Sequence, residues 1–165
     1  MRRIVSNTGP LLHLSEANAL PFLSWTGQVS IPRAVEVEMA QQNSLWPTQK
    51  PAWIHVEVLS VSYETQALSW QQAGLLQPGE AEAVALAQQV SADWLLTDDA
   101  AARLFAQSLR IEAHGSLGVV LWAAATGHSN RADAEATLER LARSSLWISA
   151  GVMAEAKAAL NKLFT

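Results

Sequence analysis

Short apolar runs alternate with longer helical stretches along this chain, and the runs end in polar or turn-forming residues. Ile4-Val5 leads into the polar turn Asn7-Thr8-Gly9-Pro10, and the apolar run that starts at Trp94 leads into Asp98-Asp99. Strands that run parallel need crossover connections, which helices usually supply. The alternation therefore predicts an α/β fold whose central parallel sheet is covered by helices on both faces.

The remaining elements follow the same pattern. Further strands are expected over 54–58, over 94–97 and near Ile111, and a polar stretch over 41–51 is expected to form a mobile loop. Neither an internal repeat nor a long linker divides the chain, so residues 1–165 are expected to form one domain. Helices are expected after Pro10, after Pro32, and over 63–72, 80–87, 100–107, 117–125, 132–143 and 150–163.

Several classes of site are excluded by what the sequence lacks. Without cysteine there are no disulfides, thiolate metal sites or cysteine nucleophiles. No P-loop or G-x-G-x-x-G pattern occurs, the serine of 115–118 lacks the spacing of a nucleophile elbow, and the four histidines lack zinc spacing. The longest apolar run, 117–125, is too short to span a membrane, so we expect a cytoplasmic protein.

Carboxylates remain as the side chains that can carry chemistry. In open parallel sheets, ligands bind beyond the carboxyl ends of the strands, where Asn7-Thr8 and Asp98-Asp99 are expected. Hard divalent ions such as Mg²⁺ and Mn²⁺ prefer oxygen ligands, and two such ions about 4 Å apart can promote hydrolysis of a phosphodiester. Acids also favour helix starts for structural reasons, so both interpretations stay open at this point. The candidate acids are Glu38, Glu80, Glu82, Asp98 and Asp99.

Five segments add a more specific signal through their order and spacing. They are SNTGPLL at 6–12, IPRAVEVE at 31–38, PGEAEA at 78–83, LTDDAAAR at 96–103 and GSLGV at 115–119. Together they resemble PIN-domain proteins, and most closely a prokaryotic subgroup of predicted PIN nucleases related to VapC-type toxins. The resemblance extends over nearly the whole chain. It implies a three-layer α/β/α sandwich and a metal-dependent ribonuclease, usually the toxin of a toxin–antitoxin pair.

The same resemblance assigns roles to individual residues. The acidic positions of the family fall on Asn7, Glu38, Glu80 and Asp99, which would hold one or two Mg²⁺ or Mn²⁺ ions, with Asp98 as a further catalytic residue. Thr8 and Arg103 would contact the substrate, with Arg33 or Arg110 as helpers or as ordinary surface arginines. Glu82 is a poorer match than Glu80 because it lies further into its helix. The expected reaction is attack of a metal-activated water on an RNA phosphodiester.

Asn7 departs from the family pattern, because asparagine stands where the first acid is usual. Its amide oxygen can bind a metal but carries no charge, which weakens the attraction for a divalent ion. A second hypothesis is therefore a catalytically weak or inactive PIN-like module that binds nucleic acid or protein. A third is a phosphatase-like hydrolase with an aspartate nucleophile at Asp98 or Asp99.

Partners are suggested by the low share of charged residues, 16%, and by seven tryptophans. Trp46 and Trp53 lie in polar, proline-flanked sequence, where an aromatic side chain either anchors a partner or folds under its own loop. The resemblance implies an RNA substrate, a small antitoxin protein and a second copy of the chain, forming a homodimer or larger homo-oligomer. No membrane association is expected.

Overall fold

A five-stranded parallel sheet forms the centre of the computed structural model, which describes residues 1–165. The strand order is β3-β2-β1-β4-β5, and every neighbouring pair is parallel. The predicted α/β class and parallel sheet are confirmed. The strands are β1 (Arg3–Ser6), β2 (Gln28–Pro32), β3 (Ile54–Glu57), β4 (Trp94–Leu96) and β5 (Ala113–His114).

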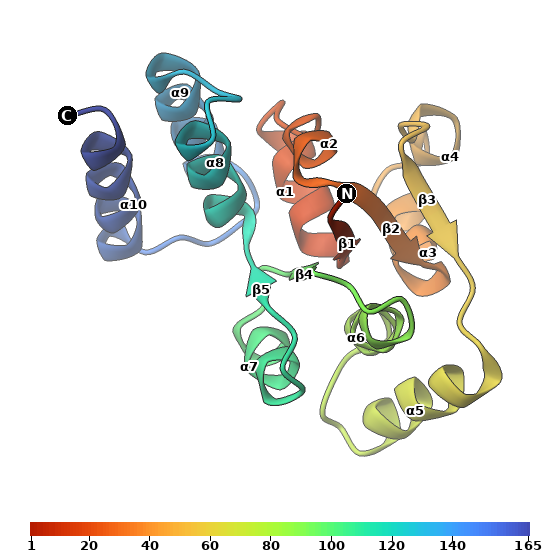
Figure 1. Ribbon diagram of the computed structural model, residues 1–165. Coiled ribbons are helices and arrows are strands. Elements are labelled where there is room, and N and C mark those ends of the chain that lie inside the picture. The colour runs from red at the N-terminus through yellow and green to blue at the C-terminus, as the bar shows by residue number, and fades with distance from the viewer.

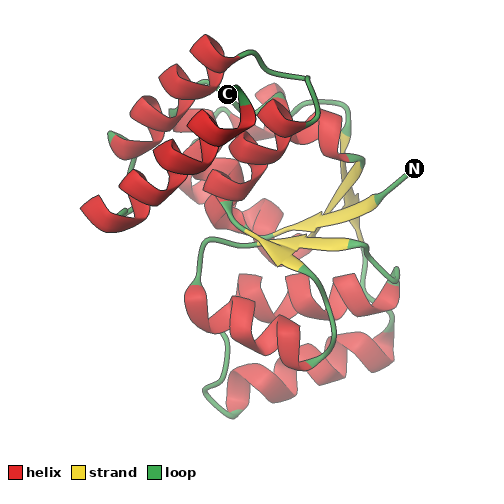
Figure 2. Ribbon diagram, turned by 60° about the vertical axis from the view of Figure 1, so that its left-hand side comes forward, coloured by secondary structure: helices red, strands yellow, loops and turns green.

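Helices cover both faces of the sheet and give the molecule three layers, as Figures 1 and 2 show. Helices α5, α6 and α7 lie against one face, and the other helices lie against the opposite face. None of the helices is both long and apolar enough to cross a membrane. The helices are α1 (Thr8–Glu16), α2 (Phe22–Thr26), α3 (Arg33–Gln42), α4 (Trp46–Gln49), α5 (Val61–Gln72), α6 (Pro78–Gln89), α7 (Ala100–Ser108), α8 (Ser116–Ala125), α9 (Arg131–Ala142) and α10 (Ala150–Leu163).

Alternation along the central strands divides the apolar side chains between two cores. Ile4 and Leu96 belong to the larger core, beneath α1, α3, α8 and α9, whereas Val5 and Leu95 belong to the smaller core beneath α6 and α7. Successive side chains of a strand point to opposite faces, so a strand covered on both sides must be apolar at every position. This explains why the central strands read as continuous apolar runs.

The order in which the strands are added to the sheet changes direction beside β1, and the site lies at this point of the sheet. Strands β2 and β3 extend the sheet on one side of β1, while β4 and β5 extend it on the other. The connections that leave β1 and β4 therefore diverge to opposite sides, which opens a crevice at the carboxyl ends of these two strands. Asn7 follows β1 directly, and Asp98 and Asp99 follow β4.

Some sequence predictions were wrong. Residues 41–51 contain the end of α3 and the short helix α4 instead of one loop, and Ile111 precedes β5 instead of lying in it. Trp46 is only 3% exposed, and its indole Nε1 donates a hydrogen bond to Glu36 Oε2 at 2.9 Å. Of the two alternatives left open for Trp46, the structure therefore shows the side chain packed under its own loop and not an exposed partner anchor.

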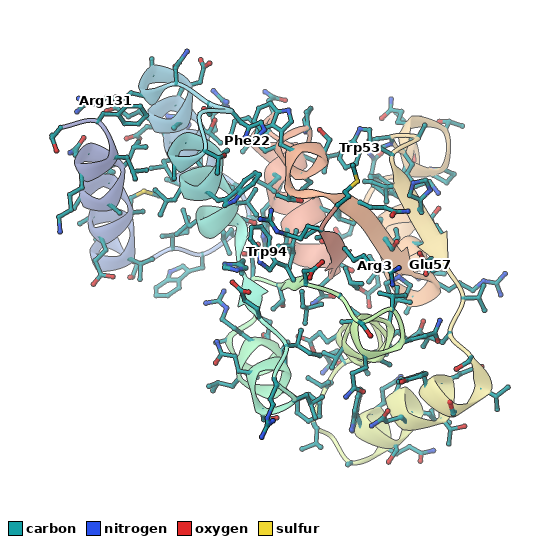
Figure 3. All side chains as sticks on the ribbon, viewed as in Figure 1. Arg3, Phe22, Trp53, Glu57, Trp94 and Arg131 are labelled. Carbon is teal, nitrogen blue, oxygen red and sulfur yellow. The ribbon has the colours of Figure 1, made fainter.

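Tryptophans account for much of the packing at the amino-terminal side of the sheet. Trp94, labelled in Figure 3, packs edge-on against Trp122 with ring centroids 5.7 Å apart. The guanidinium carbon of Arg2 lies 4.2 Å from the ring centroid of Trp94, within the range of a cation–π contact. Trp53 is partly buried against the larger core. Most of the tryptophan excess is thus explained by packing inside this chain.

Candidate active site

A pocket of about 380 Å³ opens at the carboxyl edge of the sheet, where the chain order reverses. It brings together residues that are far apart in the sequence and come from the starts of α1, α6 and α7 and from the middle of α3. All the predicted catalytic residues line it, together with Thr8. The lining residues are Asn7, Thr8, Gly9, His13, Glu38, Gln77, Glu80, Asp98, Asp99, Ser145, Leu146 and Trp147.

Asn7 links the end of β1 to the start of α1. Its backbone N–H donates to Leu96 O at 2.8 Å, and its side-chain Oδ1 accepts a hydrogen bond from Thr8 N at 2.8 Å. Its Nδ2 lies 3.4 Å from Thr97 Oγ1. The residue caps α1 and is 7% exposed, so its amide is held in a fixed orientation at the floor of the pocket.

Glu38 is held by one donor on each carboxylate oxygen. The hydroxyl of Thr8 donates to Oε2, and Gly79 N donates to Oε1 at 3.1 Å. A Cβ atom at position 79 would lie only 2.5 Å from both oxygens, so only glycine lets the start of α6 approach this carboxylate. The PGE sequence at 78–80 therefore serves to dock α6 on Glu38 as well as to begin a helix.

Glu80 occupies the third position of α6 and closes a capping box with Gln77. Its Oε1 accepts a hydrogen bond from Gln77 N at 2.9 Å. Burial raises the pKa of Glu80, the Gln77 hydrogen bond opposes that shift, and the nearby carboxylates of Asp99 and Glu38 raise the pKa further. The three acids thus form a cluster of like charge.

Asp99 is the most open of the acids that line the pocket. It caps α7, with Oδ2 accepting a hydrogen bond from Ala102 N at 2.8 Å. The residue is exposed, so Asp99 keeps oxygen lone pairs available to a ligand in the pocket.

Asp98 differs from its neighbour because three donors surround its carboxylate. His13 Nδ1 lies 2.7 Å from Oδ2, Ser116 Oγ donates to Oδ2 at 2.6 Å, and Ser116 N donates to Oδ1 at 2.6 Å. Burial opposes ionisation, but the hydrogen bonds from His13 and Ser116 outweigh it and lower the pKa of Asp98. Asp98 is therefore an ionised anchor between α1 and α8.

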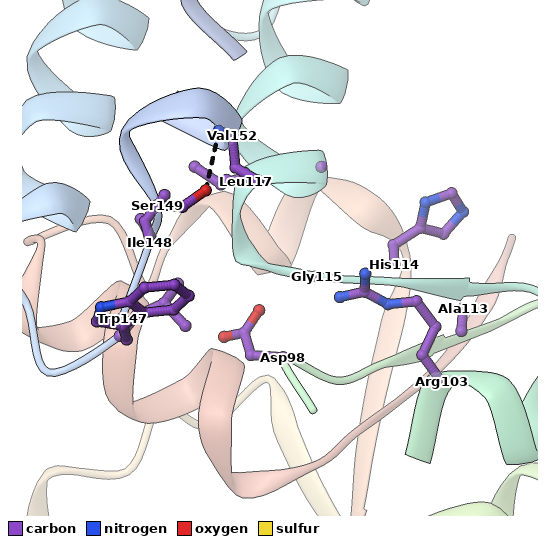
Figure 4. A pocket seen from close by; sticks show the side chains of 12 residues that line it. Asp98, Arg103, Ala113, His114, Gly115, Leu117, Trp147, Ile148, Ser149 and Val152 are labelled. Atoms are coloured by element: carbon purple, nitrogen blue, oxygen red, sulfur yellow. Dashed lines mark hydrogen bonds between the residues drawn. The ribbon is translucent and has the colours of Figure 1, made fainter. Parts of the chain in front are cut away.

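Arg103 lies beside the acidic pocket instead of within it. Its Nη2 donates to Thr97 O at 3.2 Å, and its Nε is buried without a hydrogen-bond partner. The side chain lines a second pocket of about 370 Å³, which shares Asp98, Leu146 and Trp147 with the first. Figure 4 shows Arg103 at one side of this second pocket and Asp98 near its centre.

The structure does not bring every candidate to the site. Glu82 accepts a hydrogen bond from Ala34 N at 3.2 Å and supports the start of α3. Arg33 is exposed and lines neither pocket, and Arg110 lies before β5, at the opposite edge of the sheet. These three residues have surface or structural placements.

The sequence prediction did not include three residues that line the pocket or hold Asp98. His13 and Ser116 bind Asp98 from helices that are far apart in sequence, and no motif signals such contacts. His13 lies four residues after Gly9, which also faces Asp98, so the helical repeat alone could have placed it near the site. Trp147, on the connection between α9 and α10, reaches the pocket only through the tertiary fold.

The acids approach one another without enclosing an ion. No group of three histidine or acidic side chains converges closely enough to hold a metal in the present arrangement. Two features nevertheless suit a divalent cation: the ligand atoms are carboxylate and amide oxygens, and the like charges around Glu80 would be offset by a positive ion. The residues present therefore fit a hard cation in their chemistry.

Comparison with known proteins gives one match. A family model described as a PIN domain matches residues 3–162, which is nearly the whole chain. Curated proteins and solved structures yielded no match.

Proposed function

The chain belongs to the PIN-domain family, and from this premise we propose that it is a divalent-metal-dependent endoribonuclease, the toxin of a type II toxin–antitoxin pair. PIN domains are typically nucleases, so membership supports a hydrolase that acts on nucleic acid. The observation that carries the proposal is the convergence of Glu38, Glu80 and Asp99 in one pocket at the carboxyl ends of β1 and β4.

The proposed cation ligands are Asn7, Glu38, Glu80 and Asp99. PIN nucleases generally use divalent metal ions, and these oxygen donors suit Mg²⁺ or Mn²⁺. When bound, such a cation supplies the positive charge that activates water and stabilises the charge on a phosphodiester. Small rotations of the Glu80 and Asp99 side chains would be needed, since each now gives one oxygen to a helix cap.

The other residues of the pocket have positioning roles in this proposal. Thr8 holds Glu38 through its hydroxyl, and Gly79 holds the same carboxylate from the opposite side. Asp98 acts through its contacts: it fixes His13 and Ser116 and so holds the second turn of α1 and the first turn of α8 at the pocket. Arg103, which lines the neighbouring pocket, would bind a phosphate of the RNA backbone.

A second function is favoured by Asn7. A neutral amide where an acid is usual lowers the negative charge of the ligand set, and no three groups enclose an ion in the present arrangement. Both features would suit a PIN-like module that binds nucleic acid or protein with weak or no hydrolysis. The two functions share a fold and a ligand surface, and they differ only in whether a phosphodiester is cleaved.

The decisive experiment assays purified protein, freed of partner chains, on RNA with Mn²⁺ and with EDTA. The proposal expects cleavage with Mn²⁺ and none with EDTA, and a large loss of activity in Asp99→Asn. Cleavage that persists in EDTA would contradict the metal-dependent mechanism. Binding of RNA without cleavage in Mg²⁺ or Mn²⁺ would instead support the binding module.

The toxin role has its own test in cells. The proposal places the activity in the cytoplasm, on cellular RNA, with a small antitoxin and a second copy of the chain as partners. Expression should arrest growth, and co-expression of a short protein encoded beside this gene should relieve the arrest. Arrest that is equally strong with Asp99→Asn would show that growth inhibition does not come from this pocket.

A further inference from the structure

Trp147 is the most exposed tryptophan of the chain, with 84% of its surface accessible. It lies on the connection between α9 and α10 and lines both the acidic pocket and the neighbouring pocket that contains Arg103. Scattered exposed apolar residues are ordinary, but tryptophan is mostly buried on average in folded proteins. An indole left in solvent between a polar acidic pocket and a pocket with a half-hydrophobic lining suggests a ligand with a flat, partly apolar surface.

The backbone that carries Trp147 is anchored on both sides. Ser144 Oγ donates to Leu141 O at 2.6 Å, and Ser145 Oγ donates to Glu16 Oε1 at 2.5 Å. On the other side, Ile148 packs against the larger core. The segment therefore fixes the backbone that carries the indole without covering the ring, so ligand binding has to order only the side-chain torsions of Trp147.

The neighbouring pocket joins the indole to a cationic group. Figure 4 shows Trp147 and Arg103 on opposite sides of it, with Asp98 between them. Arg103 lines this pocket, and its guanidinium is oriented by the hydrogen bond from Nη2 to Thr97 O. A guanidinium suits phosphate, and an indole face suits a nucleobase. The volume of about 370 Å³ is within the range of small-ligand pockets.

We propose that Trp147 is a stacking platform for one base of a single-stranded nucleic acid, with Arg103 binding a backbone phosphate in the same pocket. The inference rests on the proposed function, because it places this nucleotide beside the phosphodiester held at the acidic pocket. It specifies a single strand, since the bases of a duplex are already stacked and paired and cannot lie on an indole.

The test measures binding separately from cleavage. The full-length protein is titrated against a labelled single-stranded RNA of about eight nucleotides, in EDTA and at low salt, with fluorescence anisotropy as the readout. Trp147→Ala should weaken binding about 5- to 150-fold, while Trp147→Phe should bind nearly as well as the parent. Leu104→Ala is the matched control, because it removes an exposed apolar side chain that lines neither pocket.

A second arm identifies the contact as stacking. An oligonucleotide with the same backbone but abasic positions should bind the parent and Trp147→Ala equally, because the phosphates remain and the bases are gone. A difference that persists on this abasic strand would overturn the proposal. So would unchanged RNA binding in Trp147→Ala, or a change in its sedimentation that shows Trp147 to be a contact between protein chains.

These outcomes separate the inference from the proposed function. Weaker RNA binding in Trp147→Ala together with no cleavage in Mn²⁺ would support the platform and contradict the nuclease. Metal-dependent cleavage with equal RNA binding and equal KM in parent and Trp147→Ala would support the nuclease and overturn the platform.

Discussion

Asp98 and Asp99 are adjacent in the chain and differ in almost every physical respect. The Asp98 carboxylate is 8% exposed and is held by His13 and by the hydroxyl and backbone N–H of Ser116. Asp99 is exposed and accepts one hydrogen bond, from the start of α7. The oxygens of Asp98 are occupied by hydrogen bonds within the protein, whereas Asp99 remains accessible to a ligand.

The contrast extends to the regions around the two residues. On the Asp98 side, donors outnumber acids, and the pKa of Asp98 is lowered despite burial. On the Asp99 side, three acids face one another, and burial and like charge raise the pKa of Glu80. In the first region hydrogen-bond donors balance the negative charge of Asp98 and hold α1 to α8. In the second region the negative charges repel one another, and a bound cation would offset them.

The largest expected effect is on cleavage by Asp99→Asn. Even residues that only orient metal ligands change activity about 10- to 100-fold, so removing a charged ligand should lower metal-dependent RNA cleavage at least ~100-fold. Asparagine also caps helices, so the free energy of unfolding should change by less than ~0.5 kcal/mol. Initial rates with Mn²⁺ and urea unfolding check both statements. Asp133→Asn, an exposed acid of α9, serves as the control.

The second-largest expected effect is on stability, which Asp98→Asn should lower. Asparagine keeps one acceptor but turns an amide N–H₂ toward donors that need an acceptor. The cost should be about 1.5–3 kcal/mol in the free energy of unfolding, as expected for hydrogen bonds to a charged group. Urea unfolding at neutral pH measures it. If Asp98→Asn and Asp99→Asn prove equally stable, the distinction between anchor and ligand is wrong.

A pH series sharpens the same comparison. The folded-state pKa of Asp98 is lowered, so its contribution to stability is present above its ordinary pKa of 3.8 and is lost as pH falls through the lower folded pKa. The parent should therefore lose stability in that acid range, and Asp98→Asn should lose less of it. Urea midpoints between about pH 2 and pH 6 give the slopes. Parallel curves for the two proteins would remove Asp98 as the source of the acid loss.

The smallest expected effect is a gain in stability, from a substitution of Glu80. Because the pKa of Glu80 is raised in the folded state, the stabilisation from its protonated form is present below its ordinary pKa of 4.5 and is lost as pH rises through the folded pKa. Glu80→Gln keeps the capping box, since glutamine also serves there, and removes the repulsion. In metal-free protein at neutral pH it should raise stability by less than about 0.5 kcal/mol. A clear loss of stability would contradict the like-charge account.

Local sequence was sufficient to predict the ends of β1 and β4, and with them the position of the pocket. Apolar runs that end at Val5 and at Leu96 mark strand ends directly, and parallel strands bring those ends to one edge. Glu38 and Glu80 needed the family resemblance, because acids on helices are common and their pairing across α3 and α6 depends on tertiary packing. The close approach at Gly79, which makes that packing possible, cannot be read from the pattern of apolar residues.

The division of roles between Asp98 and Asp99 could not be predicted. It depends on His13 and Ser116, which reach Asp98 across 85 and 18 residues of sequence. Trp46 shows the same limit, since its polar, proline-flanked surroundings fit both an exposed anchor and a side chain folded under its own loop, and only the contact with Glu36 shows that it is buried. Trp147 is the converse, an aromatic residue next to Leu146 and Ile148 that the fold leaves in solvent.

The central claim is that Glu38, Glu80 and Asp99, and not Asp98, hold a divalent cation. Calorimetric titration with Mn²⁺ tests this claim most directly. The parent should bind Mn²⁺, Asp99→Asn should bind it at least ~10-fold more weakly, and Asp98→Asn should retain most of the affinity at a pH and temperature where it is folded. Binding of Mn²⁺ that is equal in the parent and in Asp99→Asn would contradict the account.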